Sequence, residues 1–260
     1  MLVLYDNPFS PFARKVRLVL ERKDLAYTSV DALALGEVAA LAAVNPRREV
    51  PVLVDGALVV GNSRDIVDYL EHRHPAPAVL PADPEQRVAA RAWERLADTV
   101  LDAIIHDVSL WTWPTHHRDD RPPPGLIDAG VRDVETILDR LEATLAAHHL
   151  FVCGEEPSIA DLALFPHMTS LRALGIGLDA DARPRVDAWS RRMRALPYVA
   201  RDLASVKRAL AEKFGGGASP YEGEKVVWRG DRLEWLFHHG FADWWYGELA
   251  AGRVVVPDPL

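Results

Sequence analysis

The first 75 residues alternate short apolar runs with segments whose apolar positions recur at helical spacing. The runs predict strands and the amphipathic segments predict helices. The expected elements are strands over 2–5 and 26–30, a hairpin over 50–60, and helices over 11–24, 36–44 and 62–74. The order β-α-β-α-β-β-α predicts a mixed sheet: a crossover helix makes the first two strands parallel. Asp55-Gly56 joins the last two as an antiparallel hairpin.

The pattern changes at a proline-rich stretch, 75–84, which has the character of an inter-domain linker. Beyond it the periodicity is helical. The expected helices cover 84–110, 126–147, 158–173, 184–195 and 197–213, with a last one beginning at Asp231. The predicted organisation is an α/β domain over 1–76, a linker over 77–85, an all-α domain over 86–212, and an extension over 213–260 with one helix.

Composition narrows the function classes. The net charge of −8 argues against nucleic-acid binding, which requires a basic face. One cysteine, Cys153, excludes an intrachain disulfide and a cysteine-based zinc site, and we expect a buried packing thiol. No apolar run is long enough to span a bilayer, and no secretory signal is recognisable, so a cytoplasmic protein without membrane contact is expected.

Ser10 stands directly before the helix that begins at Pro11. By itself this position indicates a helix cap, because serine accepts a bond from the first free amides. The second interpretation is a binding role, since the N-terminal end of a helix is positively polarised. The two interpretations remain open on this segment alone.

Four motifs carry a resemblance to a known family. They are "FSPFARKVRLVL", "NPRREVPVLVDG", "GNSRDIVDYL" and "FVCGEEPSIADLAL". Together with the domain order they resemble the cytosolic glutathione transferases, in particular tau-like, omega-like and bacterial members. The resemblance covers about residues 1–212 and leaves the tail unexplained. It implies a thioredoxin-like domain followed by an all-helical domain, glutathione as co-substrate, and a homodimer.

The resemblance also implies roles for individual residues. Ser10 becomes the catalytic residue, with Phe12 of the same segment in the glutathione site. Val50 precedes a cis-proline, Pro51, and would pair with the peptide of glutathione; the alternative is a proline at a strand start. A serine in place of a catalytic cysteine cannot form a mixed disulfide, which favours conjugation over thiol transfer.

Energetics make a dual role for Ser10 reasonable. The glutathione thiol, with a pKa of ~8.5, is mostly protonated at neutral pH. Lowering that pKa by ~2 units needs about 2.7 kcal/mol of preferential thiolate binding. A helix terminus supplies roughly 0.3–2 kcal/mol, and a hydroxyl donating to the anion adds ~1.5–3 kcal/mol. The two contributions together suffice.

The sequence departs from the family pattern at two positions. Asn62 stands where relatives carry Glu or Gln, while the following Ser63 matches and is expected to hold the γ-glutamyl carboxylate. Glu49 stands where relatives often carry Lys, so Arg48 or Arg47 would have to bind the glycyl carboxylate. These departures motivate a non-catalytic alternative, a transferase-like binding or regulatory protein.

The remaining candidates lie in the helical part. His106, Trp111 and Trp113 are candidates for the pocket of the electrophile, with a plain core or interface role as the alternative. Asp161 resembles the family's structural capping acid. Adjacent histidines do not share a helix face, so no metal site is expected. The tail tryptophans could close over the site, form a subunit contact or pack on the helical domain; packing is favoured.

The leading functional hypothesis is therefore a Ser-type glutathione S-transferase that conjugates the glutathione thiolate to an apolar electrophile in detoxification. Ether cleavage, dehalogenation or isomerisation at the same site is the second hypothesis.

Overall fold

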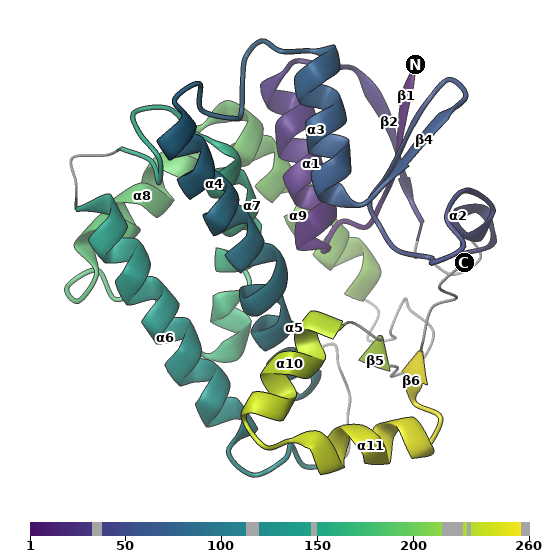
Figure 1. Ribbon diagram of the computed structural model, residues 1–260, viewed down its shortest axis with the longest axis vertical. Helices are drawn as coiled ribbons and strands as arrows, with labels where there is room; N and C mark the ends of the chain where they lie inside the picture. Colours follow the sequence, from purple (N-terminus) through teal and green to yellow (C-terminus); the bar gives the residue numbers. More distant parts are fainter. Residues whose placement is uncertain (33–37, 113–119, 147–149, 215–225, 228–229, 256–260) are drawn as a thin grey trace.

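The computed structural model describes residues 1–32, 38–112, 120–146, 150–214, 226–227 and 230–255. A four-stranded sheet with helices on its faces lies beside a larger group of helices (Figure 1). This is the expected glutathione transferase fold, an α/β domain followed by an all-α domain. Among the described residues, no helix combines the length and apolar character that crossing a bilayer requires.

The sheet has the strand order β2-β1-β3-β4. Its elements are β1 (Leu2–Asp6), α1 (Pro11–Arg22), β2 (Tyr27–Asp31), α2 (Val38–Val44), β3 (Val52–Asp55), β4 (Leu58–Gly61) and α3 (Ser63–Arg73). As predicted, β1 and β2 are parallel and β3 and β4 are antiparallel. The structure adds that β3 pairs antiparallel with β1 in the middle of the sheet.

Helix α1 lies between the sheet and the helical part, and it packs against α3, α7 and α9. Its apolar residues Val16, Val19 and Leu20 are fully buried, as the helical spacing predicts. Its polar side is buried as well: Lys15 has 0% exposed surface and Arg14 has 2%. A helix enclosed on all sides must find partners for these charges, because an unpaired buried charge is costly.

The helical part contains α4 (Pro84–Leu96), η1 (Ala97–Leu101), α5 (Asp102–Thr112), α6 (Leu126–Leu145), α7 (Ile159–Met168), η2 (Leu171–Leu174), α8 (Pro184–Ala195) and α9 (Pro197–Phe214). The helix expected over 84–110 is interrupted by a π-helical turn, η1. The helix expected over 158–173 ends at Met168, because Pro166 lacks an amide hydrogen and removes a bond from the last turn.

Asp161 and Cys153 have the structural roles that the sequence analysis expected for them. Asp161 caps α7: its carboxylate accepts hydrogen bonds from the Ser158 amide at 2.8 Å and from Trp189 Nε1 at 2.8 Å. Burial raises the pKa of Asp161, and these hydrogen bonds oppose the rise. Cys153 is a buried free cysteine, and burial raises the pKa of its thiol to about 11.

The C-terminal extension contains β5 (Val226–Val227), α10 (Gly230–His238), α11 (Ala242–Ala250) and β6 (Val254–Val255). The prediction of a single helix is wrong. The missed helix, α11, has three aromatic residues and a glycine, all with weak helix propensity, and Trp245 packing into the core overrides that weakness.

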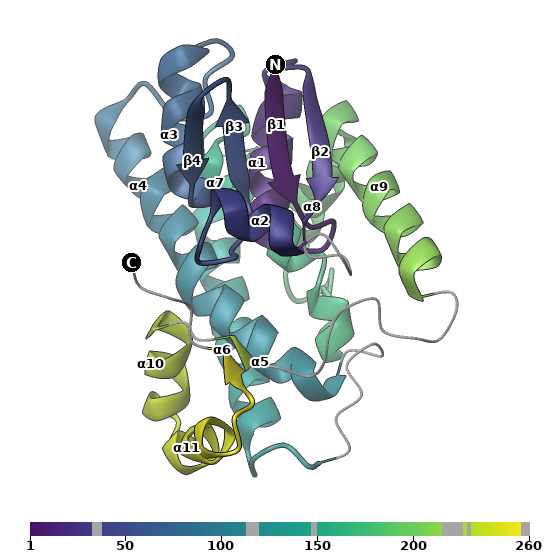
Figure 2. The ribbon, with the colours of Figure 1, turned by 90° about the vertical axis from the view of Figure 1, so that its right-hand side faces the viewer.

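Helix α10 packs against α5 and η1 (Figures 1 and 2). Trp235 and Trp245 are buried, and Trp235 Nε1 donates a hydrogen bond to Asp133 at 2.9 Å. The expectation that the tail tryptophans pack on the helical domain is confirmed for these two residues.

Candidate active site

Strand pairing brings the three candidate segments to one edge of the sheet. Tyr5, near the end of β1, pairs with Val52 at the start of β3. Val52 also pairs with Gly61 at the end of β4. The loop that carries Ser10, the Val50-Pro51 pair and the Asn62-Ser63 pair therefore emerge at the same edge, although up to 53 positions separate them in the sequence.

Ser10 is the N-cap of α1. Its backbone is extended, with φ −63° and ψ 119°, and its Oγ accepts a hydrogen bond from the Ala13 amide at 3.3 Å. The side chain is half-buried. Because the cap uses a lone pair of Oγ, the hydroxyl hydrogen remains available to donate to an anion at the helix end. The cap and the binding role are thus compatible in one side chain.

The loop before Ser10 is held by its own hydrogen bonds. The Ser10 amide donates to the Asn7 carbonyl at 3.2 Å, and Asn7 Oδ1 accepts from the Phe9 amide at 3.0 Å. These bonds form a compact turn between β1 and α1, which fixes the direction in which Ser10 projects.

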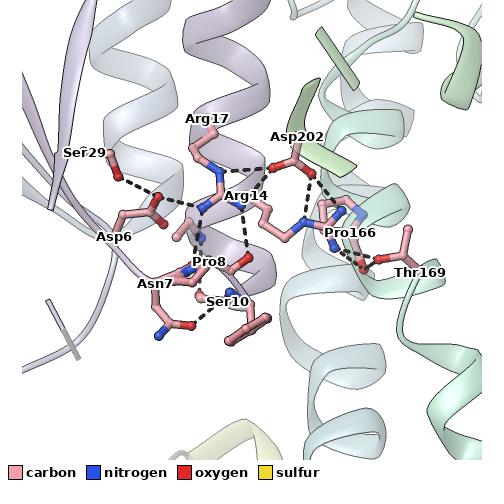
Figure 3. Close-up of polar contacts among 12 residues, drawn as sticks. Asp6, Asn7, Pro8, Ser10, Arg14, Arg17, Ser29, Pro166, Thr169 and Asp202 are labelled. Atoms are coloured by element: carbon pink, nitrogen blue, oxygen red, sulfur yellow. Dashed lines mark hydrogen bonds and ion pairs between the residues drawn. The ribbon is translucent and has the colours of Figure 1, made fainter. Parts of the chain in front are cut away.

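A buried ionic network lies directly behind this loop (Figure 3). Asp202 of α9 accepts from Arg14 Nη2 and from Arg17 Nη2, each at 2.8 Å. Arg17 Nη1 contacts Asp6 of β1 at 2.6 Å, and Arg17 Nη2 donates to the Pro8 carbonyl at 3.1 Å. Arg17 therefore ties the Ser10 loop to the first strand and to the helical part.

Burial and the neighbouring carboxylates have opposite effects on the pKa values of the two arginines in this network. Burial lowers the pKa of Arg14, and its contact with Asp202 does not fully offset that effect. Burial alone would also lower the pKa of Arg17, but Asp6 and Asp202 together raise this pKa above its ordinary value. Arg17 is thus a fixed cation behind the Ser10 loop.

The Val50–Pro51 peptide bond is cis, as the family resemblance implies. Within the described part of the chain, the backbone of Val50 forms no hydrogen bond. Arg47 and Glu49 pair with each other through two contacts, of 2.8 Å and 3.0 Å. The exposed Arg48 has no ion pair among the described residues. Its guanidinium group therefore remains available to bind an anion next to Val50.

Asn62 caps α3, and its Oδ1 accepts from the Arg64 amide at 2.9 Å. Its φ of 65° is in the left-handed region, where asparagine is tolerated better than the longer Glu or Gln. Ser63 is the first residue of α3 and its side chain is buried. The pair therefore presents a helix N-terminus, a site that favours anions.

The three pocket candidates have different environments. His106 is half-buried on α5. Trp111, near the end of α5, has its ring centroid 5.5 Å from that of Trp244 in the extension, and its Nε1 donates to Asp120. Trp113 lies outside the described residues. No hydrogen bond joins His106 or Trp111 to Ser10 among the residues that the structure describes.

Sequence reasoning named Phe12 but missed Phe9, Phe214, His167 and Asp202 around the loop. The ring of Phe9 lies 5.6 Å from that of Phe214 at the end of α9, and the ring of Phe12 lies 6.0 Å from that of His167 on α7. The partners of these residues are 155 to 205 positions away in the sequence, so periodicity offers no signal for them. Among the described residues, no group of three His, Cys, Asp or Glu side chains could hold a metal ion.

Two family models match the chain. Residues 4–78 match the glutathione S-transferase N-terminal domain, and residues 124–192 match the glutathione S-transferase C-terminal domain. A probable glutathione S-transferase of Zea mays is 30% identical over 77% of this chain and 89% of its own length. The chain belongs to the glutathione S-transferase family, and it is an enzyme of that family.

Other relatives widen the range of reactions within the family. A maleylacetoacetate isomerase of Pseudomonas aeruginosa is 28% identical over 70% of this chain and 87% of its own length. A glutathione S-transferase of Methylobacterium radiotolerans, solved in complex with glutathione sulfonate, superposes with a TM-score of 0.64. That structure is 28% identical and covers 77% of this chain and 93% of its own. Glutathione as co-substrate fits these relatives, and the particular reaction is not fixed by them.

Proposed function

We propose that the enzyme conjugates the glutathione thiolate to an apolar electrophilic substrate, with Ser10 as the catalytic residue. The observation that carries the proposal is the position of Ser10: a half-buried hydroxyl that caps α1 and retains a hydrogen to donate. A thiolate at this point would receive that hydrogen bond and the favourable field of the helix terminus. Attack of the sulfur on an electrophilic carbon then forms the thioether and releases the leaving group, or adds to the acceptor.

The rest of the peptide would follow the edge of the sheet. The Val50 backbone, which has no hydrogen-bond partner among the described residues, would pair with the cysteinyl residue of glutathione. Ser63 and Asn62 at the start of α3 would hold the γ-glutamyl end. Pro51 fixes the backbone that presents Val50, and Phe12 would lie beside Ser10 in the first turn of α1.

Arg48 is our choice for the glycyl carboxylate. Arg47 already has a carboxylate partner in Glu49, whereas Arg48 has none among the described side chains. Glu49 stands where relatives often carry Lys, and its negative charge is balanced locally by the ion pair with Arg47. An exposed ion pair of this kind contributes roughly 0–1 kcal/mol to stability, so it constrains the loop only weakly.

The electrophile would occupy the space next to the helical part, with His106, Trp111 and Trp113 as candidate wall residues. The aromatic contact of Trp111 with Trp244 suggests that the extension shapes this wall. Glutathione-dependent isomerisation is the second candidate reaction, because a maleylacetoacetate isomerase is among the relatives. Both reactions need the same thiolate and differ only in the fate of the adduct.

Assembly and cellular context are part of the same proposal. Exposed apolar side chains gather on β4 and at the start of α4, including Val59 and the 71%-exposed Val88. Both elements lie toward the left of Figure 2, where they would suit an isologous homodimer. A free cysteine without a disulfide agrees with a cytoplasmic enzyme of detoxification.

The experiment has two parts. Calorimetric titration with glutathione tests binding, and product analysis with an activated aryl chloride and with a cis-dienoic acid separates conjugation from isomerisation. We expect binding and a thioether product. An isomerised acid without thioether would favour the second reaction, and a folded protein that binds no glutathione would favour the non-catalytic alternative.

A further inference from the structure

The C-terminal extension reaches into the helical part with a charged side chain. Arg232 on α10 has 7% of its surface exposed, although it lies 40 positions beyond the end of the matched C-terminal domain at residue 192. Its Nη2 lies 3.3 Å from Oδ2 of Asp102, at the start of α5. Asp102 has 5% exposed surface, so this contact is an ion pair in the interior of the protein.

Asp102 also contacts a second side chain, which lies closer to α1. Its other oxygen, Oδ1, lies 3.5 Å from Nε2 of His167 on α7. The ring of His167 stands edge-on to the ring of Phe12, with 6.0 Å between centroids and 90° between planes. Phe12 is two residues after Ser10. Four side chains from α10, α5, α7 and α1 thus form a continuous series from the extension to the candidate active site: Arg232, Asp102 and His167 are buried and Phe12 is half-buried.

Each ring nitrogen of His167 faces an oxygen atom. Nδ1 is 2.9 Å from the Ala163 carbonyl oxygen, which can only accept, so Nδ1 carries a hydrogen. Nε2 faces the Asp102 carboxylate in a buried place and has no other partner among the described residues. Arg232, on the far oxygen of the same carboxylate, balances its charge.

Other charged groups surround His167 and have their own partners. From α1, Arg14 Nη1 donates to the Pro166 carbonyl and to Thr169 Oγ1, on either side of His167. Lys15 of the same helix pairs with Glu94 of α4 and with Asp98 of η1, the carboxylate of which also interacts with His167. The α1 side of His167 is therefore cationic, and Asp98 and Asp102 are the acids on its other side.

We propose that Arg232 is a positioning residue for the active site: by holding Asp102 against His167, it fixes Phe12 and the first turn of α1. Docking of the extension and stabilisation of the thiolate at Ser10 are then coupled. The inference rests on the proposed role of Ser10 and goes beyond it, because it makes residues outside both matched domains part of the glutathione site. An extension that only filled space would need no buried arginine, which is costly to place in the interior.

The test compares R232M with a matched control, R253M. Arg253 also belongs to the extension, but its 2.8 Å ion pair is with Glu248 of the same extension. The readout is the thiol pKa of bound glutathione, followed by thiolate absorbance against pH in the binary complex. This measurement needs no electrophile, so it reports even if the enzyme conjugates none of the substrates offered.

For R232M we expect the thiol pKa to rise by about 0.5–1 unit, and kcat/KM at a pH below both pKa values to fall about three- to tenfold. The glutathione Kd measured by calorimetry at a pH below both pKa values should change less than twofold. R253M should leave the thiol pKa where it is in the unaltered enzyme, even if it lowers Tm, and R232K should restore most of the loss. An R232M enzyme with an unshifted pH profile would overturn the proposal.

The variant H167Q tests the part of the series next to Phe12. It also replaces R232M as the test if R232M does not fold. It should raise the thiol pKa by a similar amount, and adding R232M to H167Q should produce no further rise, because both act through one connection. Independent, additive rises in the double variant, or an H167Q enzyme with an unshifted thiol pKa, would show that Arg232 does not act through His167. If Ser10→Ala leaves the thiol pKa unchanged while R232M shifts it, the assignment of Ser10 fails and the coupling survives.

Discussion

Replacing Ser10 by alanine removes two interactions at once. The first is the cap of α1, in which Oγ accepts from the Ala13 amide at 3.3 Å. The second is the hydrogen bond that the hydroxyl would donate to the bound thiolate. The two losses have different signatures: the first lowers the free energy of unfolding with or without glutathione, and the second changes only the ionisation of the bound thiol.

The magnitudes can be worked out separately. Loss of a serine cap costs about 1 kcal/mol, within a range of roughly 0.5–2 kcal/mol. A hydrogen bond to an ionised group contributes ~1.5–3 kcal/mol. At 1.36 kcal/mol per pKa unit, this loss raises the thiol pKa by about 1–2 units. At a pH below both pKa values, the fraction of thiolate, and with it kcat/KM, should fall about 10- to 100-fold, while the helix terminus keeps part of the stabilisation.

The assay combines thiolate absorbance of the binary complex against pH with the pH profile of kcat/KM. Both curves should move to higher pH together in Ser10→Ala. Ser10→Thr keeps a hydroxyl and should keep most of the low-pH activity. Denaturant unfolding of the free enzyme measures the loss of the cap independently.

Asp83 provides the matched control. It caps α4 as Ser10 caps α1, and its Oδ1 accepts from the Gln86 amide at 2.9 Å at an exposed position. Asp83→Ala should lose about 1 kcal/mol of stability and leave the thiol pKa unchanged. The reasoning is refuted if Ser10→Ala, like Asp83→Ala, loses stability only and retains full activity with an unshifted thiol pKa.

Three further predictions concern groups in the interior. Asp202→Asn should lower the free energy of unfolding by about 3–5 kcal/mol in denaturant titrations, because two buried arginines lose their shared anion; a midpoint within error of the original would contradict this. Asp161→Ala should cost about 3–4 kcal/mol, since the Ser158 and Val152 amides and Trp189 Nε1 lose their acceptor, and an unchanged Tm would be evidence against the capping role. With its pKa raised to about 11, Cys153 should react with iodoacetamide at mildly alkaline pH about a hundredfold more slowly than a free cysteine; equal rates in the folded and urea-unfolded protein would be inconsistent with that pKa.

Local signals in the sequence predicted much of the candidate site. A serine before a proline at a helix start predicts a cap wherever it occurs, and Ser10 has that role. The Asn62-Ser63 pair predicts the start of α3 in the same way. These features depend on bonds between residues two or three positions apart, so the sequence near each residue contains the necessary information. The resemblance to the family then supplied the chemistry that local rules lack.

Helix α1 shows where such reasoning ends. Its periodic apolar residues predicted one buried face, yet Arg14, Lys15 and Arg17 are buried too. Their acidic partners come from α4 and η1, and from β1 and α9, whose Asp6 and Asp202 are drawn in Figure 3. Periodicity describes which residues share a face, and it cannot tell that a polar face will be enclosed by a second domain.

The sequence alone therefore predicted most of the elements and their caps, because these follow from short-range hydrogen bonding and hydrophobic spacing, and the family resemblance supplied the proposal that Ser10 is the reactive hydroxyl. The tertiary structure decided which charges lie behind Ser10, and how Arg232 of the extension comes within 3.3 Å of Asp102. Those pairings join positions up to 188 residues apart. They exist because burying a charge is favourable only where packing delivers its partner to the same place.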